Sequence, residues 1–242
     1  MEIGQYCEIG RVREENQDTI ATRALPDGIL AVVCDGMGGM QGGKEASNIA
    51  AAAFVNRMMQ DYQANMEPDA LSDLLHQAVA DANRGVYTAA VAANLRMRMG
   101  TTLVAAVLRG QECFIVNIGD SRAYVINTDA PPVQLTLDHT AAQYLYERGD
   151  ITAEQCATHP RRNELTRAIG VMPHVLADRF DCTLESKQRL LLCSDGLYGM
   201  LDDTTIGTLA SSAEPADAAK QLLDAANEQG GRDNISVILI AP

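Results

Sequence analysis

The chain has 242 residues, of which 47% are hydrophobic and 21% are charged. This composition excludes disorder as the general state and supplies enough apolar side chains for a sizeable core. The 32 acidic and 19 basic residues give a net charge of −13, which disfavours nucleic acid and anionic membrane surfaces as partners. No segment approaches the roughly 18 apolar residues of a membrane span, so we expect no membrane insertion.

The six cysteines form no Cys-x-x-Cys pair, which argues against a zinc ribbon or a thioredoxin-like motif. Cys34, Cys113 and Cys193 lie inside apolar, strand-like runs, so we expect buried free thiols in a reducing compartment. Residues 1–5 have neither the basic nor the apolar region of a secretory signal. Together these features predict a cytoplasmic location.

Hydrophobic periodicity predicts the elements in chain order. Short apolar runs between Gly and Asp residues indicate strands, and apolar residues at three- and four-residue steps indicate helices. Turn residues between 101 and 137 predict an antiparallel meander. In order, we expect a strand over 29–34, helices over about 44–62 and 69–94, strands over 101–108, 113–118, 122–126, 133–137 and 190–193, a helix between Pro215 and Gly230, and a strand over 235–240.

Helices inserted between runs of antiparallel strands predict two sheets packed face to face, with helices on the outer faces. The expected fold class is therefore α+β, a four-layer α-β-β-α sandwich. The sequence has no internal repeat or linker, so we expect a single domain over 1–242. The stretch from about 138 to 167 is polar and breaks both periodicities. We expect a mobile surface flap there.

Aspartates lie at the ends of several predicted strands. Asp35, Asp120, Asp195 and Asp233 each flank an apolar run, and Asp18 precedes a strand-like run. Any one of them is explained equally well as an ordinary turn residue. If the strand ends of two packed sheets bring the carboxylates together, these repel one another unless protons or cations neutralise them. Oxygen ligands without His or Cys suit Mg²⁺ or Mn²⁺ rather than zinc.

An ordered set of motifs spans residues 13 to 234. It resembles the metal-dependent protein phosphatases (the PPM family, protein phosphatase type 2C), especially compact bacterial members that consist of the catalytic domain alone. The resemblance implies a central β-sandwich flanked by helices, with a metal cluster in a cleft at one end. The motifs are Arg13-x4-Asp18, Asp35-Gly36-Met37-Gly38-Gly39, Gly100-Thr101-Thr102, Gly119-Asp120-Ser121-Arg122, Leu165-Thr166-Arg167-Ala168-Ile169-Gly170, Ser194-Asp195-Gly196 and Gly231-Arg232-Asp233-Asn234.

The resemblance implies a set of metal ligands, residue by residue. Asp35 would bridge two tightly bound ions, Mn²⁺ or Mg²⁺, and the carbonyl of Gly36 would coordinate one of them. Asp195 and Asp233 would complete the coordination of the other ion. Asp120 would bind a third, weaker ion together with Asp195.

The remaining roles concern water and substrate. By the same resemblance, Asp18 would hold metal-bound water, Asn234 would support the site by hydrogen bonding, and Arg13 would grip the substrate phosphate with its planar charged fork. The alternative for Arg13 is a solvated ion pair with a neighbouring glutamate. Arg167 either reaches the substrate or packs structurally.

One position departs from many eukaryotic relatives, which have a histidine where this chain has Met37. That histidine is a candidate general acid for the leaving alkoxide. Here the proton donor would be a metal-bound water or a histidine of the flap, His139 or His159. For each histidine, a plain surface position is the competing interpretation.

The function implied is that of a phosphoserine/phosphothreonine protein phosphatase that acts by direct in-line attack of a metal-bridging hydroxide, without a phosphoenzyme. Its partners would be phosphorylated proteins, including a bacterial Ser/Thr protein kinase that it opposes, and we expect a monomer. One alternative is a catalytically silent module that binds phosphoproteins on the same fold. A two-metal nuclease or phosphodiesterase is a third hypothesis, against which the net charge of −13 weighs.

Overall fold

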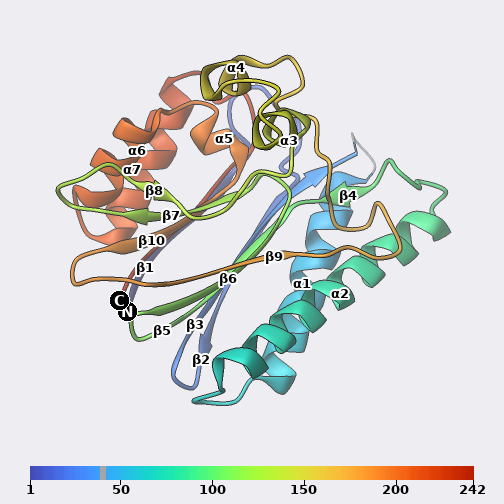
Figure 1. Ribbon diagram of the computed structural model, residues 1–242, viewed down its shortest axis with the longest axis horizontal. Helices are drawn as coiled ribbons and strands as arrows, with labels where there is room; N and C mark the ends of the chain where they lie inside the picture. Colours follow the sequence, from blue (N-terminus) through green and yellow to red (C-terminus); the bar gives the residue numbers. More distant parts are fainter. Residues whose placement is uncertain (39–41) are drawn as a thin grey trace.

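The computed structural model describes residues 1–38 and 42–242. Two antiparallel sheets pack face to face (Figure 1). One sheet runs in the order β1 (Glu2–Glu8), β11 (Ile235–Ala241), β10 (Arg189–Cys193), β7 (Arg122–Ile126) and β8 (Val133–Gln134). The other runs β2 (Asp18–Leu25), β3 (Gly28–Met37), β5 (Leu103–Arg109), β6 (Glu112–Ile118) and β9 (Asp178–Thr183), and the short β4 (Gly100–Thr101) pairs with β3.

Helices cover both outer faces of the sandwich. The antiparallel pair α1 (Gly43–Asp61) and α2 (Pro68–Ala92) packs on the β3 sheet, and α5 (Asp195–Tyr198), α6 (Asp203–Ser211) and α7 (Pro215–Glu228) pack on the β11 sheet (Figure 1). Two short helices, α3 (Ala141–Glu147) and α4 (Ala153–Thr158), lie at one end of the sandwich, at the top of the view. The predicted four-layer α+β sandwich is confirmed.

The alternation of side chains along β3 explains how this strand serves two cores. The core under α1 and α2 receives Leu30, Val32 and Cys34. The core between the sheets receives Ile29, Ala31 and Val33. Asp35 continues the second set, so its side chain points between the two sheets at the end of the sandwich.

The predicted meander from 101 to 137 is wrong. β5 and β6 pair as expected, but β7 belongs to the other sheet, where it lies between β10 and β8. The chain passes from one sheet to the other at residues 119–121, and Gly119 has a φ of 100° there, a value that glycine adopts without strain. This crossing places Asp120 at the same end of the sandwich as Asp35.

The predicted flap also contains more structure than its polar sequence indicates. Within 138–167, α3 begins after Thr140 and α4 after Thr152, and in each case the threonine hydroxyl accepts a hydrogen bond from a backbone N–H in the first helical turn. Helices of six or seven residues are too short to produce a clear period.

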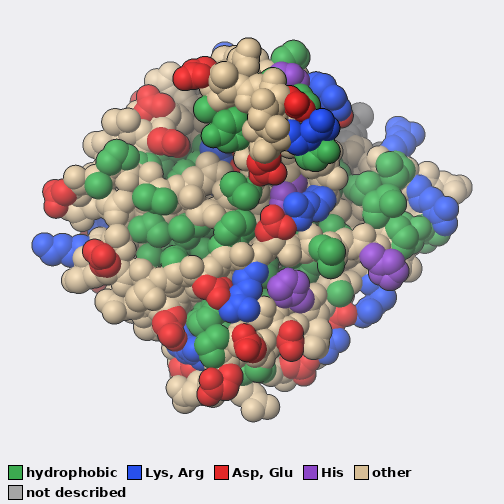
Figure 2. Space-filling view, viewed as in Figure 1, with side chains coloured by type: hydrophobic (Ala, Val, Ile, Leu, Met, Phe, Trp, Pro, Cys, Tyr) green, Lys and Arg blue, Asp and Glu red, His purple; other side chains and the backbone are tan. Residues whose placement is uncertain are grey.

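Acidic side chains are unevenly distributed over the face drawn in Figure 2. Figure 2 shows Asp and Glu side chains gathered toward the lower edge of the face in view, the end at which the β2–β3 turn lies in Figure 1. Among the residues that the structure describes, none of the helices combines the length and the apolarity that a bilayer crossing needs.

The packing of α1 gives a test of the fold. Phe54 is fully buried under this helix, whereas Met59 on the same helix is 48% exposed. We predict that Phe54→Ala lowers the free energy of unfolding by about 3–5 kcal/mol, because it removes a buried aromatic ring and leaves a cavity. Met59→Ala should stay within about 0.5 kcal/mol of the parent protein. Urea unfolding measures both, and equal effects would contradict the burial of α1.

Candidate metal centre and active site

An open cavity of about 1200 Å³ lies at the end of the sandwich where β2, β3 and β11 carry their polar residues. Asp18 is buried behind it, with 7% of its surface exposed. The structure therefore gathers at one place residues that lie as far apart in the chain as 13 and 234. The lining includes Arg13, Asp35, Gly36, Asp120, Arg167, Asp195, Asp233 and Asn234.

Asp18 is held by hydroxyl groups from the opposite sheet. The register of β2 and β3 places Asp18 directly across from Asp35. Its Oδ2 accepts hydrogen bonds from Ser194 Oγ (2.8 Å) and Ser236 Oγ (2.7 Å). Its Oδ1 is buried and has no hydrogen-bond partner among the described residues. A buried acceptor of this kind requires water or a cation.

Asp35 is held through its backbone. Its N–H donates to Thr102 Oγ1 (2.9 Å), and its carbonyl accepts from Thr101 Oγ1 (2.8 Å) and from the Thr102 N–H (2.9 Å). The Gly-Thr-Thr motif thus fixes the backbone of Asp35 and uses none of its carboxylate oxygens.

Gly36 lies where α1 begins close to the site. A Cβ at this position would come within 2.2 Å of the Gly43 carbonyl oxygen and 2.6 Å of the Gln17 carbonyl oxygen. Only glycine permits this approach of the two backbones. Gly39, the last residue of the same motif, lies outside the described residues.

Asp195 and Asp233 come from the β11 side of the sandwich. Asp195 opens α5 directly after β10, and its Oδ1 is buried without a hydrogen-bond partner in the described structure. Asp233 precedes β11, and its Oδ2 accepts a hydrogen bond from Arg13 Nη2 at 2.6 Å. Arg13 therefore pairs with one of the predicted metal ligands and not with Glu14 or Glu15, the surface partners considered from the sequence. It brings a positive charge to the carboxylates.

Asn234 connects the N-terminal loop to β11. Its Oδ1 accepts from the Gln17 N–H (2.8 Å), and its Nδ2 donates to the carbonyls of Ile9 (2.9 Å) and Glu15 (3.0 Å). These bonds fix the loop that carries Arg13 against the sheet that carries Asp233.

The carboxylates are buried together, and this changes their acidity. Burial raises the pKa of Asp18 and of Asp195 to about 6 and that of Asp120 to about 8. Burial, followed by the charges of Asp18 and Asp195, raises the pKa of Asp35 well above its ordinary value. Each ionised carboxylate makes ionisation of the next one harder. A cation in the cavity would relieve this repulsion.

The donor set fits hard divalent ions in type and charge, because it consists of carboxylate and carbonyl oxygens. The unpartnered Oδ1 atoms of Asp18 and Asp195 agree with this fit. Within residues 1–38 and 42–242, however, no three His, Cys, Asp or Glu side chains are arranged to hold one ion by themselves. Mg²⁺ and Mn²⁺ commonly keep several waters, so water and the Gly36 carbonyl would complete their coordination.

The flap histidines do not reach the cavity. His139 is 4% exposed, its Nδ1 accepts from the Gly119 N–H (3.0 Å), and its Nε2 donates to Asp178 Oδ2 (3.2 Å). His159 Nδ1 accepts from the backbone N–H of Arg161 (3.1 Å). Neither ring lines the cavity, so in this arrangement neither is placed to donate a proton there.

Arg167 lines the cavity, as expected for a residue that reaches the substrate. Its guanidinium also donates to Asp178 Oδ1 (2.5 Å) and to the Leu176 carbonyl (3.2 Å), as expected for a structural role.

Sequence patterns did not identify the hydroxyl groups that hold the aspartates. Ser236 carries a signal, because it is a polar residue inside the apolar run of β11. Ser194, Thr101 and Thr102 belong to the motifs themselves, but no periodicity shows which backbone group each of them contacts.

Comparisons with known proteins identify the family of the chain. The family model "Protein phosphatase 2C" matches residues 10–239. A serine/threonine phosphatase stp of Listeria welshimeri is 34% identical over 233 residues, which cover 96% of this chain and 92% of that protein. The structure of the serine/threonine phosphatase Stp1 from Staphylococcus aureus has a TM-score of 0.91 and 32% identity, covering 100% of this chain and 95% of that one. A catalytic domain of the phosphatase PstP in complex with two manganese ions has a TM-score of 0.84 and 30% identity, covering 98% and 96%.

The fold and these comparisons together define an enzyme of the protein phosphatase class. The chain belongs to the protein phosphatase 2C family. The comparisons confirm the family that the motifs predict. They also confirm the prediction that the protein is an enzyme of the protein phosphatase class.

The pKa of Asp120 predicts how stability depends on pH. In the unfolded chain this group has its ordinary pKa near 3.8, and in the fold about 8. Below pH 4 the Asp120 carboxyl is protonated in both the folded and the unfolded state. Between pH 4 and 8 it ionises in the unfolded state and stays protonated in the fold, which favours unfolding. The free energy of unfolding therefore falls as pH rises through this range. In chelator, Asp120→Asn should therefore become more stable than the parent protein as pH rises from 5 to 9. We expect a gain on the order of 1 kcal/mol or more, or at least about 2–4 °C in melting temperature.

Thermal unfolding in EDTA over this pH range measures the difference. The exposed Asp129→Asn is the matched control and should leave the pH profile unchanged. A constant difference between Asp120→Asn and the parent protein at every pH would contradict the buried, ionisable Asp120.

Proposed function

We propose that the protein hydrolyses phosphoserine and phosphothreonine monoesters in proteins and that it requires Mn²⁺ or Mg²⁺. The observation that carries this proposal is the group of buried aspartates around one open cavity, whose pKa values are raised by burial and by one another. The relatives named serine/threonine phosphatase, and the PstP domain with two manganese ions, support it.

The proposed ligands divide between the two sheets. Asp35 and the Gly36 carbonyl come from β3, whereas Asp195 and Asp233 come from the ends of β10 and β11. Two ions would bind tightly between them, and Asp120 with Asp195 would hold a third, weaker one. When bound, the ions supply an activated water and positive charge that offsets the charge of the phosphate oxygens.

The chain's own residues orient water and phosphate. Asp18 Oδ1 faces no protein donor in the described structure and would accept a hydrogen bond from a water. Arg13, 56% exposed at its side chain, would turn its fork from Asp233 toward the phosphate of a substrate. Burial raises the pKa of Cys34 and of Cys193, so neither thiol is a nucleophile. We therefore infer direct in-line attack by water, with no phosphoenzyme.

The proposed function extends to the domain, the oligomeric state, the substrates and the location of the protein. We infer one catalytic domain over residues 1–242 with a flap at about 138–167, a monomer, and phosphoprotein substrates that include a Ser/Thr kinase which the enzyme opposes. The cysteines are free, and free cysteines suit the reducing cytoplasm.

Metal removal tests the proposed function. With EDTA we expect hydrolysis of a phosphothreonine peptide to stop and to recover when Mn²⁺ or Mg²⁺ is added in excess, because every proposed ligand is a hard oxygen. A phosphodiester assayed in parallel should not be turned over. Full activity in excess chelator would contradict the metal-dependent mechanism, and preferential cleavage of the diester would favour a nuclease or phosphodiesterase.

Arg13→Ala tests the phosphate contact separately. We predict that it lowers kcat/KM by about one to two decades, since a charge-assisted contact contributes about 1.5–3 kcal/mol. Arg13→Lys should recover only part of this loss, because an ammonium cannot reproduce a two-pronged contact. Mn²⁺ affinity should not fall, because Arg13 competes with cations for Asp233. Weaker Mn²⁺ binding with an unchanged KM would assign Arg13 to the metal centre instead.

A further inference from the structure

The backbone around Asp120 is held from several directions. The residue follows Gly119 at the crossing between the sheets, and the Gly119 carbonyl accepts a hydrogen bond from the His139 N–H at 3.0 Å. On the other side, Tyr198 donates from its hydroxyl to the carbonyl of Asp120 at 2.9 Å. As with Asp35, the protein holds the backbone here and leaves the carboxylate toward the cavity.

Tyr198 comes from the helix that carries Asp195. Helix α5 runs Asp195–Tyr198, so the tyrosine lies three residues, or about one helical turn, after the aspartate. Asp195 and Asp120 both line the cavity. A single helical turn and one phenol therefore connect two carboxylates that come from distant parts of the chain.

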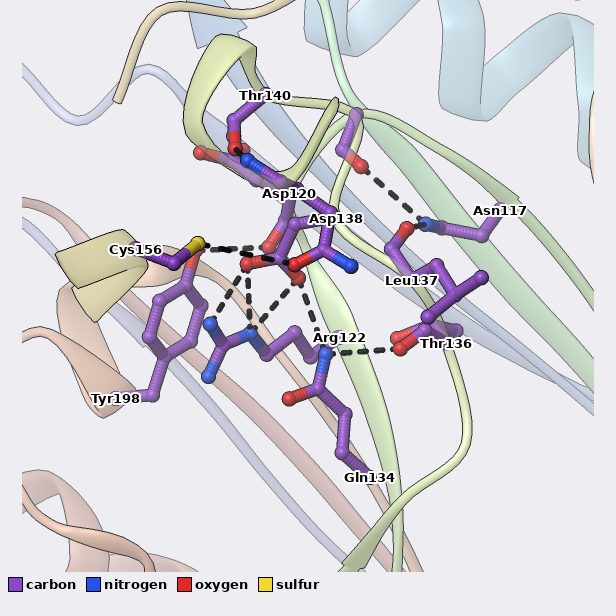
Figure 3. A network of polar contacts seen from close by, with 12 residues as sticks. Asn117, Asp120, Arg122, Gln134, Thr136, Leu137, Asp138, Thr140, Cys156 and Tyr198 are labelled. Atoms are coloured by element: carbon purple, nitrogen blue, oxygen red, sulfur yellow. Dashed lines mark hydrogen bonds and ion pairs between the residues drawn. The ribbon is translucent and has the colours of Figure 1, made fainter. Parts of the chain in front are cut away.

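The ring of Tyr198 is itself fixed in place. The Arg122 guanidinium lies over it, 3.6 Å from the ring centroid. Asp138 binds that guanidinium through both oxygens, with distances of 2.7–3.2 Å, and Gln134 Nε2 donates to Asp138 at 3.1 Å. Figure 3 shows the guanidinium held between the Asp138 carboxylate and the tyrosine ring. The Arg122 and Asp138 side chains are only 20% and 14% exposed, so solvent screens this pair little.

We propose that Tyr198 is a positioning residue for Asp120, and that Arg122 and Asp138 position Tyr198. This inference rests on the proposed role of Asp120 and Asp195 as ligands of the weaker third ion. The Tyr198 hydroxyl fixes how far the Asp120 turn stands from α5 and thus the separation of the two ligands. Because Asp138 begins the flap, the base of the flap and the third-ion site form one connected unit.

Metal titration distinguishes this role from a merely structural one. Tyr198→Phe keeps the ring and its contact with Arg122 and removes only the hydroxyl. We expect the dissociation constant of the weakest Mn²⁺ site, measured by calorimetry on metal-stripped protein, to rise about three- to tenfold, the effect of losing one hydrogen bond. The tighter sites should change less than about twofold. Arg122→Lys should weaken the same site, because a lysine keeps the charge but not the planar stack.

Tyr62→Phe is the matched control. Its hydroxyl donates to Asp27 Oδ1 at 2.6 Å, close to the β2–β3 turn and at the opposite end of that hairpin from Asp18 and Asp35. It loses a comparable hydrogen bond and should lower stability without changing any Mn²⁺ constant. A loss of stability in Tyr198→Phe with all Mn²⁺ constants unchanged would overturn the inference.

Asp120→Asn in the same titration tests the ligand role of Asp120 separately from the positioning role of Tyr198. If Asp120→Asn weakens the third site and Tyr198→Phe does not, the positioning role of Tyr198 is wrong and the ligand role of Asp120 stands. If Asp120→Asn leaves every Mn²⁺ constant unchanged, the ligand role is wrong, and the inference about Tyr198 is overturned with it.

Discussion

Mutual repulsion among buried carboxylates is the constraint on which the rest of this structure depends. Strand ends from both sheets direct Asp18, Asp35, Asp195 and Asp233 to one end of the sandwich, and the crossing between the sheets adds Asp120. The fold contains hydrophobic cores under the helices and between the sheets, and these keep the strand ends fixed while like charges accumulate there. Such a group is stable only with protons or with cations. At neutral pH the proposed metal ions would neutralise this repulsion.

The supporting hydrogen bonds follow a common pattern, which preserves the carboxylate oxygens for the cavity. Threonine hydroxyls hold the backbone of Asp35, and the Tyr198 hydroxyl holds the backbone of Asp120. Asp18 is bound at one oxygen only, by Ser194 and Ser236, and keeps the other oxygen unpartnered among the described residues. Ligands held in this way keep their geometry before an ion arrives, which reduces the cost of ordering them on binding.

Sequence patterns predicted the helices and strands that are marked by a pattern within one continuous stretch of the chain. Helices α1, α2 and α7 carry apolar residues at three- and four-residue steps, and the strands β3, β10 and β11 contain apolar runs. The sheet to which β7 belongs could not be predicted, because alternation and turn residues say nothing about the partner strand. β1 and β9 mix exposed and half-buried residues at sheet edges, and α3 and α4 are too short. At the site, the motifs named the residues around the cavity, but the contact between Tyr198 and Asp120 joins positions 78 residues apart and is not visible in any pattern.

Locating the bound ions tests the proposed metal centre most directly. Crystals grown with Mn²⁺ and measured at the manganese absorption edge give anomalous peaks only where that metal is bound. We predict two strong peaks between Asp35, the Gly36 carbonyl, Asp195 and Asp233, and a weaker third peak between Asp120 and Asp195. Peaks at another place on the protein, or none in this cavity at saturating Mn²⁺, would contradict the claim that these carboxylates are gathered to bind metal.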